Sequence, residues 1–137
     1  MSEKVEFELV SPERLLISQA VDMVVVPGSE GDFGALPRHA PMITSVRPGV
    51  IAIYEDGDVS ERIFVAGGFA EVTEARVTVL AEEAVKVSDL NHEGVATRLR
   101  LAEEALEEAD TDVTRVQAQR ALVVARAMQA ALGATVH

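Results

Sequence analysis

The sequence predicts an α+β fold in which a β-rich body comes first and a pair of antiparallel helices follows. Apolar and polar residues alternate through the first half, as they do in strands with one buried face. All five aromatic residues and all five prolines lie in that half, whereas the second half is rich in Ala, Glu and Arg and has helical periodicity. We place the boundary after Val87, which gives domains of residues 1–87 and 88–137.

The first half reads as a series of short strands. Val5, Phe7 and Leu9 alternate with charged residues, and further strands are expected at residues 15–17, 21–26, 50–54, 61–65, 69–73 and 76–81. Asp56-Gly57 supplies the positive φ angles that a tight hairpin turn needs. Many short strands separated by turns are typical of a β-sandwich.

Beyond Val87, two apolar stripes recur at intervals of three and four residues, the spacing of amphipathic helices. They comprise Val95, Leu99, Ala102, Leu106 and Ala109, and then Ala118, Ala121, Ala125, Met128 and Leu132. Ser88 or Asp89 is expected to cap the first helix, residues 109–112 to form the turn, and Gly133 to end the second helix. Because the stripes match in length, the helices are expected to pack as an antiparallel hairpin.

Composition excludes several classes of function. With 23 acidic and 12 basic residues the net charge is -11, so nucleic acid or an anionic membrane is not expected as a partner. There is no cysteine, and His39, His92 and His137 have no second ligand at helical spacing, so neither a metal site nor another cofactor is expected. No nucleophile with an adjacent base is recognisable, which argues against an enzyme.

The start of the chain, Met1-Ser2-Glu3-Lys4, lacks a basic segment followed by an apolar one, and no apolar run approaches the roughly 18 residues of a membrane span. We therefore expect a cytosolic, soluble chain.

Charge is sorted within the helical half. Residues 88–112 carry eight acidic residues and two arginines, whereas residues 113–137 carry three arginines and no acid. These arginines either pair with the acids of the first helix or leave them to pair with an acidic surface of another protein. Such an exchange is possible because each exposed pair contributes only about 0–1 kcal/mol. The residues concerned are Glu103, Glu104, Glu107 and Glu108, and Arg115, Arg120 and Arg126. Apolar residues off the stripe of the second helix indicate a further contact: Val113, Val116, Val123, Val124 and Ala127.

The glycine-rich stretch at residues 28–34 does not fit a phosphate-binding loop, because two acids and Pro37 stand where a lysine and a helix are needed. It reads as a strand connection whose acids and exposed Phe33 form a recognition loop.

The order and spacing of several segments resemble the epsilon subunit of bacterial F-type ATP synthases over almost the whole chain. The longest runs from Val26-Pro27-Gly28 to His39-Ala40-Pro41, and the others are residues 9–13, 47–51, 67–72 and 77–81. The resemblance implies a ten-stranded β-sandwich followed by an antiparallel helical hairpin. It also implies a non-catalytic rotor subunit of the central stalk, peripheral to the cytoplasmic side of the bacterial inner membrane.

By this resemblance, the sandwich binds the gamma subunit and rests on the c-ring, so that rotation of the ring is passed to gamma. The residues that correspond to this contact are Glu30, Gly31, Asp32, Phe33 and His39. The hairpin is implied to inhibit ATP hydrolysis by extending along gamma toward the alpha and beta subunits, with Arg115, Arg120 and Arg126 meeting an acidic segment. Whether the hairpin rests compact or extended stays open.

Some members of the family bind ATP through a motif of Ile or Leu, Asp, two variable residues, Arg and Ala. Leu90 matches, but Asn91, Gly94 and Val95 replace the acid, the arginine and the alanine. The motif is degenerate, and we expect no ATP binding.

Two other classes compete with the rotor subunit: a free ligand-sensing regulatory module and an unrecognised hydrolase. Co-purification with gamma and the c-ring favours the rotor subunit. A melting temperature shifted by a metabolite favours the sensor, and turnover by the isolated chain favours the hydrolase.

Overall fold

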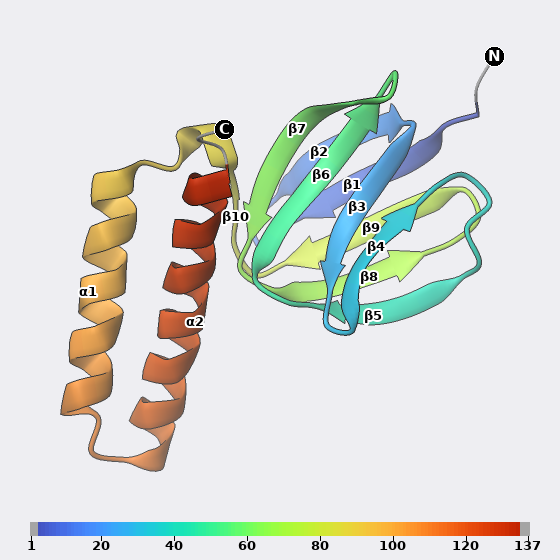
Figure 1. Ribbon diagram of the computed structural model, residues 1–137. Helices are drawn as coiled ribbons and strands as arrows, with labels where there is room; N and C mark the ends of the chain where they lie inside the picture. Colours follow the sequence, from blue (N-terminus) through green and yellow to red (C-terminus); the bar gives the residue numbers. More distant parts are fainter. Residues whose placement is uncertain (1–2, 135–137) are drawn as a thin grey trace. The chain divides into compact units, whose positions relative to one another are not determined.

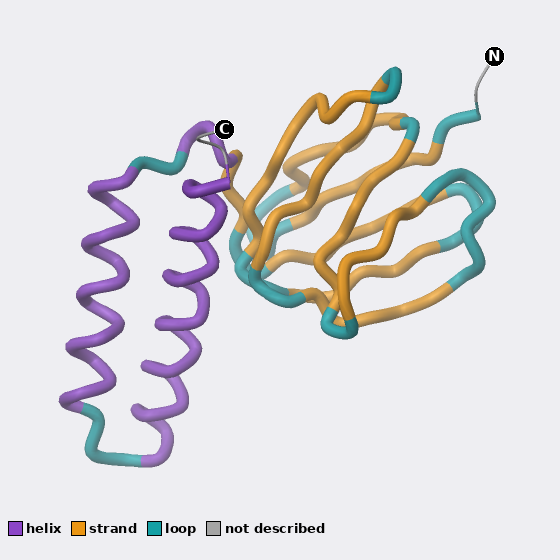
Figure 2. The backbone as a smooth tube through the Cα atoms, viewed as in Figure 1, coloured by secondary structure: helices purple, strands orange, loops and turns teal. Residues whose placement is uncertain are grey.

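The computed structural model of the protein describes residues 3–134 (Figure 1). The chain divides into two compact units, Met1–Lys86 and Val87–His137, one residue before the expected boundary. Over the described residues, all strands belong to the first unit and both α-helices to the second (Figure 2). The predicted order of a β body followed by helices is confirmed.

Ten strands build the first unit within the part of the chain that the structure describes, which confirms the ten-stranded sandwich. They are β1 (Val5–Val10), β2 (Leu15–Val21), β3 (Met23–Gly28), β4 (Gly31–Ala35), β5 (Met42–Val46), β6 (Gly49–Glu55), β7 (Asp58–Val65), β8 (Gly68–Val72), β9 (Arg76–Ala81) and β10 (Ala84–Lys86).

These strands form two layers that are joined at one place (Figure 1). One layer has the order β10-β7-β6-β3, with β4 on the other side of β3, and the second has the order β5-β8-β9-β1-β2. The layers meet where Gly28 of β3 pairs with Val46 of β5. Neighbouring strands are antiparallel, except that β1 and β9 run parallel.

The core lies between the two layers and follows the period of two that strands impose. Val5, Phe7 and Leu9 of β1 are at most 1% exposed, while Glu6 between them faces solvent. Burying a Val, Leu, Ile or Phe side chain stabilises the fold by roughly 1.5–3 kcal/mol. The same core contains Val24, Val26, Ile51, Ile53, Ile63, Val65, Ala70, Val72, Val77 and Val79.

The turn between β6 and β7 has the expected geometry. Asp56 and Gly57 have φ angles of 54° and 84°, so both occupy the left-handed region that a two-residue hairpin turn requires. The flanking residues Glu55 and Asp58 pair across the hairpin. The hairpin predicted from Asp-Gly is confirmed.

An ion-pair cluster ties the start of β1 to this turn. Lys4 Nζ lies 2.8 Å from Glu55 Oε2 and 3.0 Å from Asp22 Oδ1. The hydrogen bond to Glu55 is the main reason why the pKa of Lys4 rises. The Asp56 amide donates to Asp22 Oδ2 over 2.7 Å and is the main reason why the pKa of the Asp22 carboxyl falls. The cluster joins segments that are far apart in sequence.

The second unit begins with a 3-10 turn, Val87–Asp89, followed by α1 (His92–Glu108) and α2 (Asp112–Ala134). Ser88 and Asp89 lie in that turn, so the expectation that one of them caps α1 is wrong. Gly133 lies inside α2, so its predicted role as the residue that ends the helix is also wrong.

The two helices pack side by side, as the hairpin prediction requires. Buried or half-buried residues form the seam: Val95, Leu99, Ala102 and Leu106 on α1, and Ala118, Leu122, Ala125, Met128 and Leu132 on α2. Ala121 was predicted to belong to the seam but is exposed. Leu122 takes its place, because it lies four residues after Ala118 and three before Ala125 on the same helical face.

Neither helix, over the described residues, is long and apolar enough to cross a membrane.

At Gly68, β8 lies close against β9. The φ angle of Gly68 is 145°, and a Cβ atom placed on it would lie 1.9 Å from the carbonyl oxygen of Leu80 on β9. Only glycine fits this position without moving the backbone.

We expect Gly68→Ala to lower the free energy of unfolding by about 3 kcal/mol, through backbone strain and overpacking together. Gly57→Ala is the matched control, because its φ angle is also positive but nothing lies within 4 Å of the new Cβ; it should cost about 1 kcal/mol. Urea unfolding followed by Tyr54 fluorescence reports on the sandwich, since the chain has one tyrosine and no tryptophan. Equal destabilisation by both variants would contradict the steric explanation.

Candidate functional site

The residues expected to contact the c-ring begin at the turn between β3 and β4. Gly28 pairs with Gly31 and Pro27 with Asp32, which leaves Ser29 and Glu30 as a two-residue turn. Ser29, Glu30 and the two residues that follow are exposed. The stretch read from the sequence as a loop is therefore a strand hairpin with an acidic tip.

Phe33 and His39 lie next to one another beside this turn. Their ring centroids are 6.3 Å apart, and Phe33 packs against the core as a partly buried residue. The expectation that Phe33 is exposed is wrong, because pairing with Val26 of β3 turns its ring toward the core. His39 Nδ1 donates to the carbonyl oxygen of Ala40 over 2.7 Å.

Arg38 fixes the backbone next to His39. Its φ angle is 67°, and its amide donates to the carbonyl oxygen of Glu74 over 2.7 Å. The guanidinium Nε donates to Glu3 Oε2 over 2.9 Å. This hydrogen bond is the main reason why the pKa of the Glu3 carboxyl falls. The segment that carries His39 is thus held by polar bonds of Arg38 after β4.

A row of apolar side chains, most of them exposed, crosses the outer face of the second layer and was not predicted from the sequence. Phe69 of β8 pairs with Leu80 of β9, Leu80 with Val10 of β1, and Val10 with Leu15 of β2. Phe69, Leu80 and Leu15 are 59%, 54% and 54% exposed. We call these four residues the apolar row.

Two further features extend this surface. Ile43 of β5 is 73% exposed and pairs with Glu71, two residues along β8 from Phe69. An open groove of about 420 Å³ runs along the row, with Pro12 at its margin. The signal was present in the sequence, since Leu80 falls at an outward position of a strand whose alternate residues, Val79 and Ala81, face the core.

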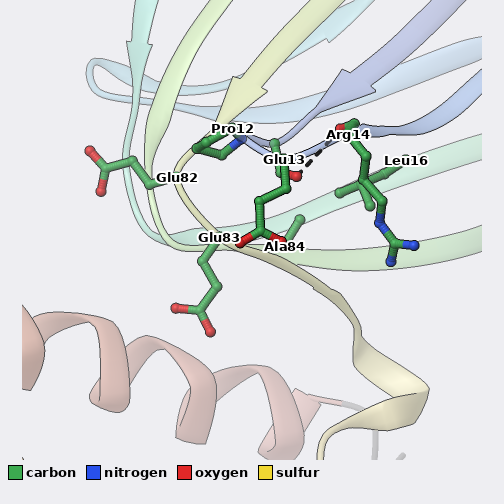
Figure 3. A pocket seen from close by; sticks show the side chains of 8 residues that line it. Pro12, Glu13, Arg14, Leu16, Glu82, Glu83 and Ala84 are labelled. Atoms are coloured by element: carbon green, nitrogen blue, oxygen red, sulfur yellow. Dashed lines mark hydrogen bonds between the residues drawn. The ribbon is translucent and has the colours of Figure 1, made fainter.

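A second, more polar hollow of about 260 Å³ lies between residues 11–16 and 82–84 (Figure 3). Ser11 Oγ donates to the carbonyl oxygen of Arg14, and the side chains of Arg14 and Glu82 point apart (Figure 3).

No group of three or more potential metal ligands occurs within residues 3–134, and His137 lies outside them.

The arginines of α2 are exposed. Pairing with the acids of α1 was one of two alternatives for them, and Arg115 pairs within its own helix instead. Arg115 Nη1 lies 3.1 Å from Asp112 Oδ1 in its own helix. On α1, Arg100 likewise pairs with Glu104 one turn away. Arg120 and Arg126 are also exposed. Val113, Val116 and Val123 of the same helix are 66%, 62% and 54% exposed, so α2 presents apolar and basic groups together.

The positions of the degenerate nucleotide motif have structural roles at the start of α1. Asn91 is the N-cap, and its Oδ1 accepts the amide of Gly94 over 2.6 Å. A Cβ on Gly94 would lie 3.0 Å from that oxygen, and Val95 is buried while Leu90 is half-buried. Asn91 is therefore engaged as the cap of α1, and its neutral side chain does not supply the charge of the family's acid.

Comparisons with known proteins agree with this architecture. Residues 4–87 match the family described as "ATP synthase, Delta/Epsilon chain, beta-sandwich domain". The ATP synthase epsilon chain of Paramagnetospirillum magneticum is 60% identical over 132 residues, covering 96% of this chain and 99% of that one. The ATP synthase epsilon chain of Rhodospirillum rubrum is 57% identical over 131 residues, covering 96% and 98%.

Solved structures show the same likeness. A chain of the mitochondrial ATP synthase of Euglena gracilis, from a structure of OSCP, F1 and c-ring, aligns with a TM-score of 0.82 at 25% identity, over 96% of this chain and 83% of that one. A chain of the central stalk and c-ring of the Tetrahymena thermophila mitochondrial ATP synthase aligns with a TM-score of 0.71 at 12% identity, over 96% and 98%, and so shares the fold.

Proposed function

The chain belongs to the delta/epsilon chain family of ATP synthases, as a non-catalytic stalk subunit, and we propose that its sandwich passes rotation of the c-ring to the gamma subunit. The observation that carries the proposal is the apolar row, an exposed apolar surface on a rigid sheet, which is typical of a protein interface. The subunit would act on the cytoplasmic side of the bacterial inner membrane, attached through the complex.

We assign the apolar row to the gamma subunit. Fully burying a Leu or Phe side chain gives roughly 1.5–3 kcal/mol, and the exposed members of the row are each a little more than half exposed. Covering the row together with Ile43 therefore supplies several kcal/mol to association. Because these side chains stand on paired strands, the contact transmits force into the sheet without deforming a loop.

The turn between β3 and β4 is assigned to the c-ring. Glu30 in the turn and Asp32 beside it on β4 are exposed acids that suit the polar loops that such a ring turns toward a stalk, and Gly31 allows the tight approach. Phe33 and His39 support the turn from behind and extend the contact at its edge. Two separate surfaces, one apolar and one acidic, thus serve two partners.

The hairpin is proposed to limit ATP hydrolysis through contacts with the alpha and beta subunits. Arg115, Arg120 and Arg126 are the basic groups proposed to meet an acidic segment, and the exposed valines of α2 provide apolar surface on the same helix. The pair between Arg115 and Asp112 is exposed, so its exchange for an intersubunit pair costs little.

We expect Phe69→Glu and Leu80→Lys each to weaken binding of the isolated gamma subunit by at least about tenfold, because a charge would be placed in an apolar interface. Leu36→Glu is the matched control, since Leu36 is 53% exposed and lies outside the row. Binding is measured by surface plasmon resonance and folding by circular dichroism. If well-folded Phe69 and Leu80 variants bind gamma as tightly as the unaltered chain, the row does not bind gamma.

Deleting all residues after Val87 is expected to raise the ATPase activity of the reconstituted complex by about twofold to tenfold without preventing assembly. A full-length variant with Arg115, Arg120 and Arg126 all replaced by Gln should produce part of the same rise, since it keeps the hairpin and removes only the charges. Unchanged ATPase activity in both complexes rules out an inhibitory hairpin.

Calorimetry of the isolated chain with ATP should detect no micromolar binding, because Asn91 is engaged as a cap and Gly94 has no side chain to meet phosphate. The double variant Asn91→Asp with Gly94→Arg restores the two charged positions of the family motif and serves as comparison. Micromolar affinity in the unaltered chain would overturn this expectation.

A further inference from the structure

Arg47 reaches across to the turn that is assigned to the c-ring. It lies between β5 and β6, and its Nη1 donates to the carbonyl oxygen of Gly28 over 2.5 Å while its Nη2 forms an ion pair with Asp32 Oδ1. Gly28 ends β3 and Asp32 belongs to β4, so one guanidinium holds both strands of the hairpin. A planar group with parallel donors suits this bridge, which a lysine cannot reproduce.

Main-chain bonds anchor the same region independently of the Arg47 side chain. The Arg47 amide donates to the carbonyl oxygen of Pro27 over 2.9 Å, and the Ser29 amide donates to that of Ser45 over 2.9 Å. The backbone at Gly49 also lies close to Pro27, since a Cβ there would be 3.1 Å from Pro27 Cβ. The hairpin therefore stays folded when the guanidinium is removed.

The ion pair itself adds little stability. The side chains of Arg47 and Asp32 are 44% and 61% exposed, and pairs of such exposure contribute about 0–1 kcal/mol. Its effects are on shape and charge: the turn is fixed to one geometry, and the charge of Asp32 is balanced. Glu30 is also exposed, and within residues 3–134 it forms no ion pair.

We propose that Arg47 is the positioning residue of the c-ring contact: it fixes the turn between β3 and β4 and balances Asp32, so that Glu30 alone presents a net negative charge to a partner surface carrying basic or amide donors. This inference rests on the proposed assignment of the turn to the c-ring. It goes beyond that assignment because Arg47 lies outside the turn and sets the geometry in which the turn meets the c-ring.

The test measures binding of the full chain, in complex with gamma, to the detergent-solubilised c-ring of its own enzyme. Arg47→Met is expected to weaken c-ring binding by about tenfold, as in the loss of one well-placed polar contact, while binding to gamma and the melting temperature stay unchanged. Arg47→Lys should weaken c-ring binding by an intermediate factor, because lysine keeps the positive charge but lacks the two parallel donors of the guanidinium. Adding Asp32→Asn to Arg47→Met should recover part of the loss by removing the unbalanced carboxylate.

Arg62→Met is the matched control, since Arg62 is an exposed arginine on β7 away from the turn, and it should leave c-ring binding unchanged. Glu30→Lys tests the proposed function separately. If Glu30→Lys weakens c-ring binding and Arg47→Met does not, the turn is the contact and the role of Arg47 is refuted. If neither variant matters, the assignment of the turn fails as well. A parallel loss of gamma binding in Arg47→Met shows a general structural role and also refutes the inference.

Discussion

The packing of two sheet layers around one apolar core determines which residues of the sandwich are left for partners. Successive side chains of a strand point to opposite faces of the sheet, so each residue that faces the core places its two neighbours on the outer face. With Val77, Val79 and Ala81 in the core, Leu80 has to face outward, and Val10 follows Leu9 in the same way. The apolar row therefore places apolar side chains at outward positions, where polar side chains are usual. Folding of the sandwich does not by itself require them there.

The hairpin follows a different physical logic. Its seam includes three alanines, Ala102, Ala118 and Ala125, which let two helices approach closely while burying little area. Most of the stability of helices in proteins comes from packing of an amphipathic face, so the helices of 17 and 23 residues each depend on a partner. An element held by modest packing energy is suited to exchanging one partner for another.

Local pattern was sufficient to predict the core and both helices, because strand alternation and helical stripes are properties of neighbouring residues. It failed where strand pairing or the geometry of a turn, rather than periodicity, decides the outcome. The glycines of residues 28–34 predicted a strand connection, yet Gly31–Ala35 pair with β3 as a strand, which turns Phe33 toward the core. Similarly, Ser88, Asp89 and Asn91 are all good caps in isolation, and only the 3-10 turn before α1 selects Asn91. The apolar row was missed because its members come from four strands whose order is set by the fold.

The two proposed contacts of the sandwich also differ in how they resist load. The apolar row stands on strands that are hydrogen-bonded along their length, so its stiffness is inherent in the sheet. A two-residue turn has no such support of its own and moves easily unless something outside it holds it. Main-chain bonds from Ser45 and Arg47 hold its base, and the Arg47 guanidinium spans its two strands. A contact that must push against a rotating ring requires this kind of bracing more than it requires affinity, which explains why an exposed, energetically weak ion pair would be placed there.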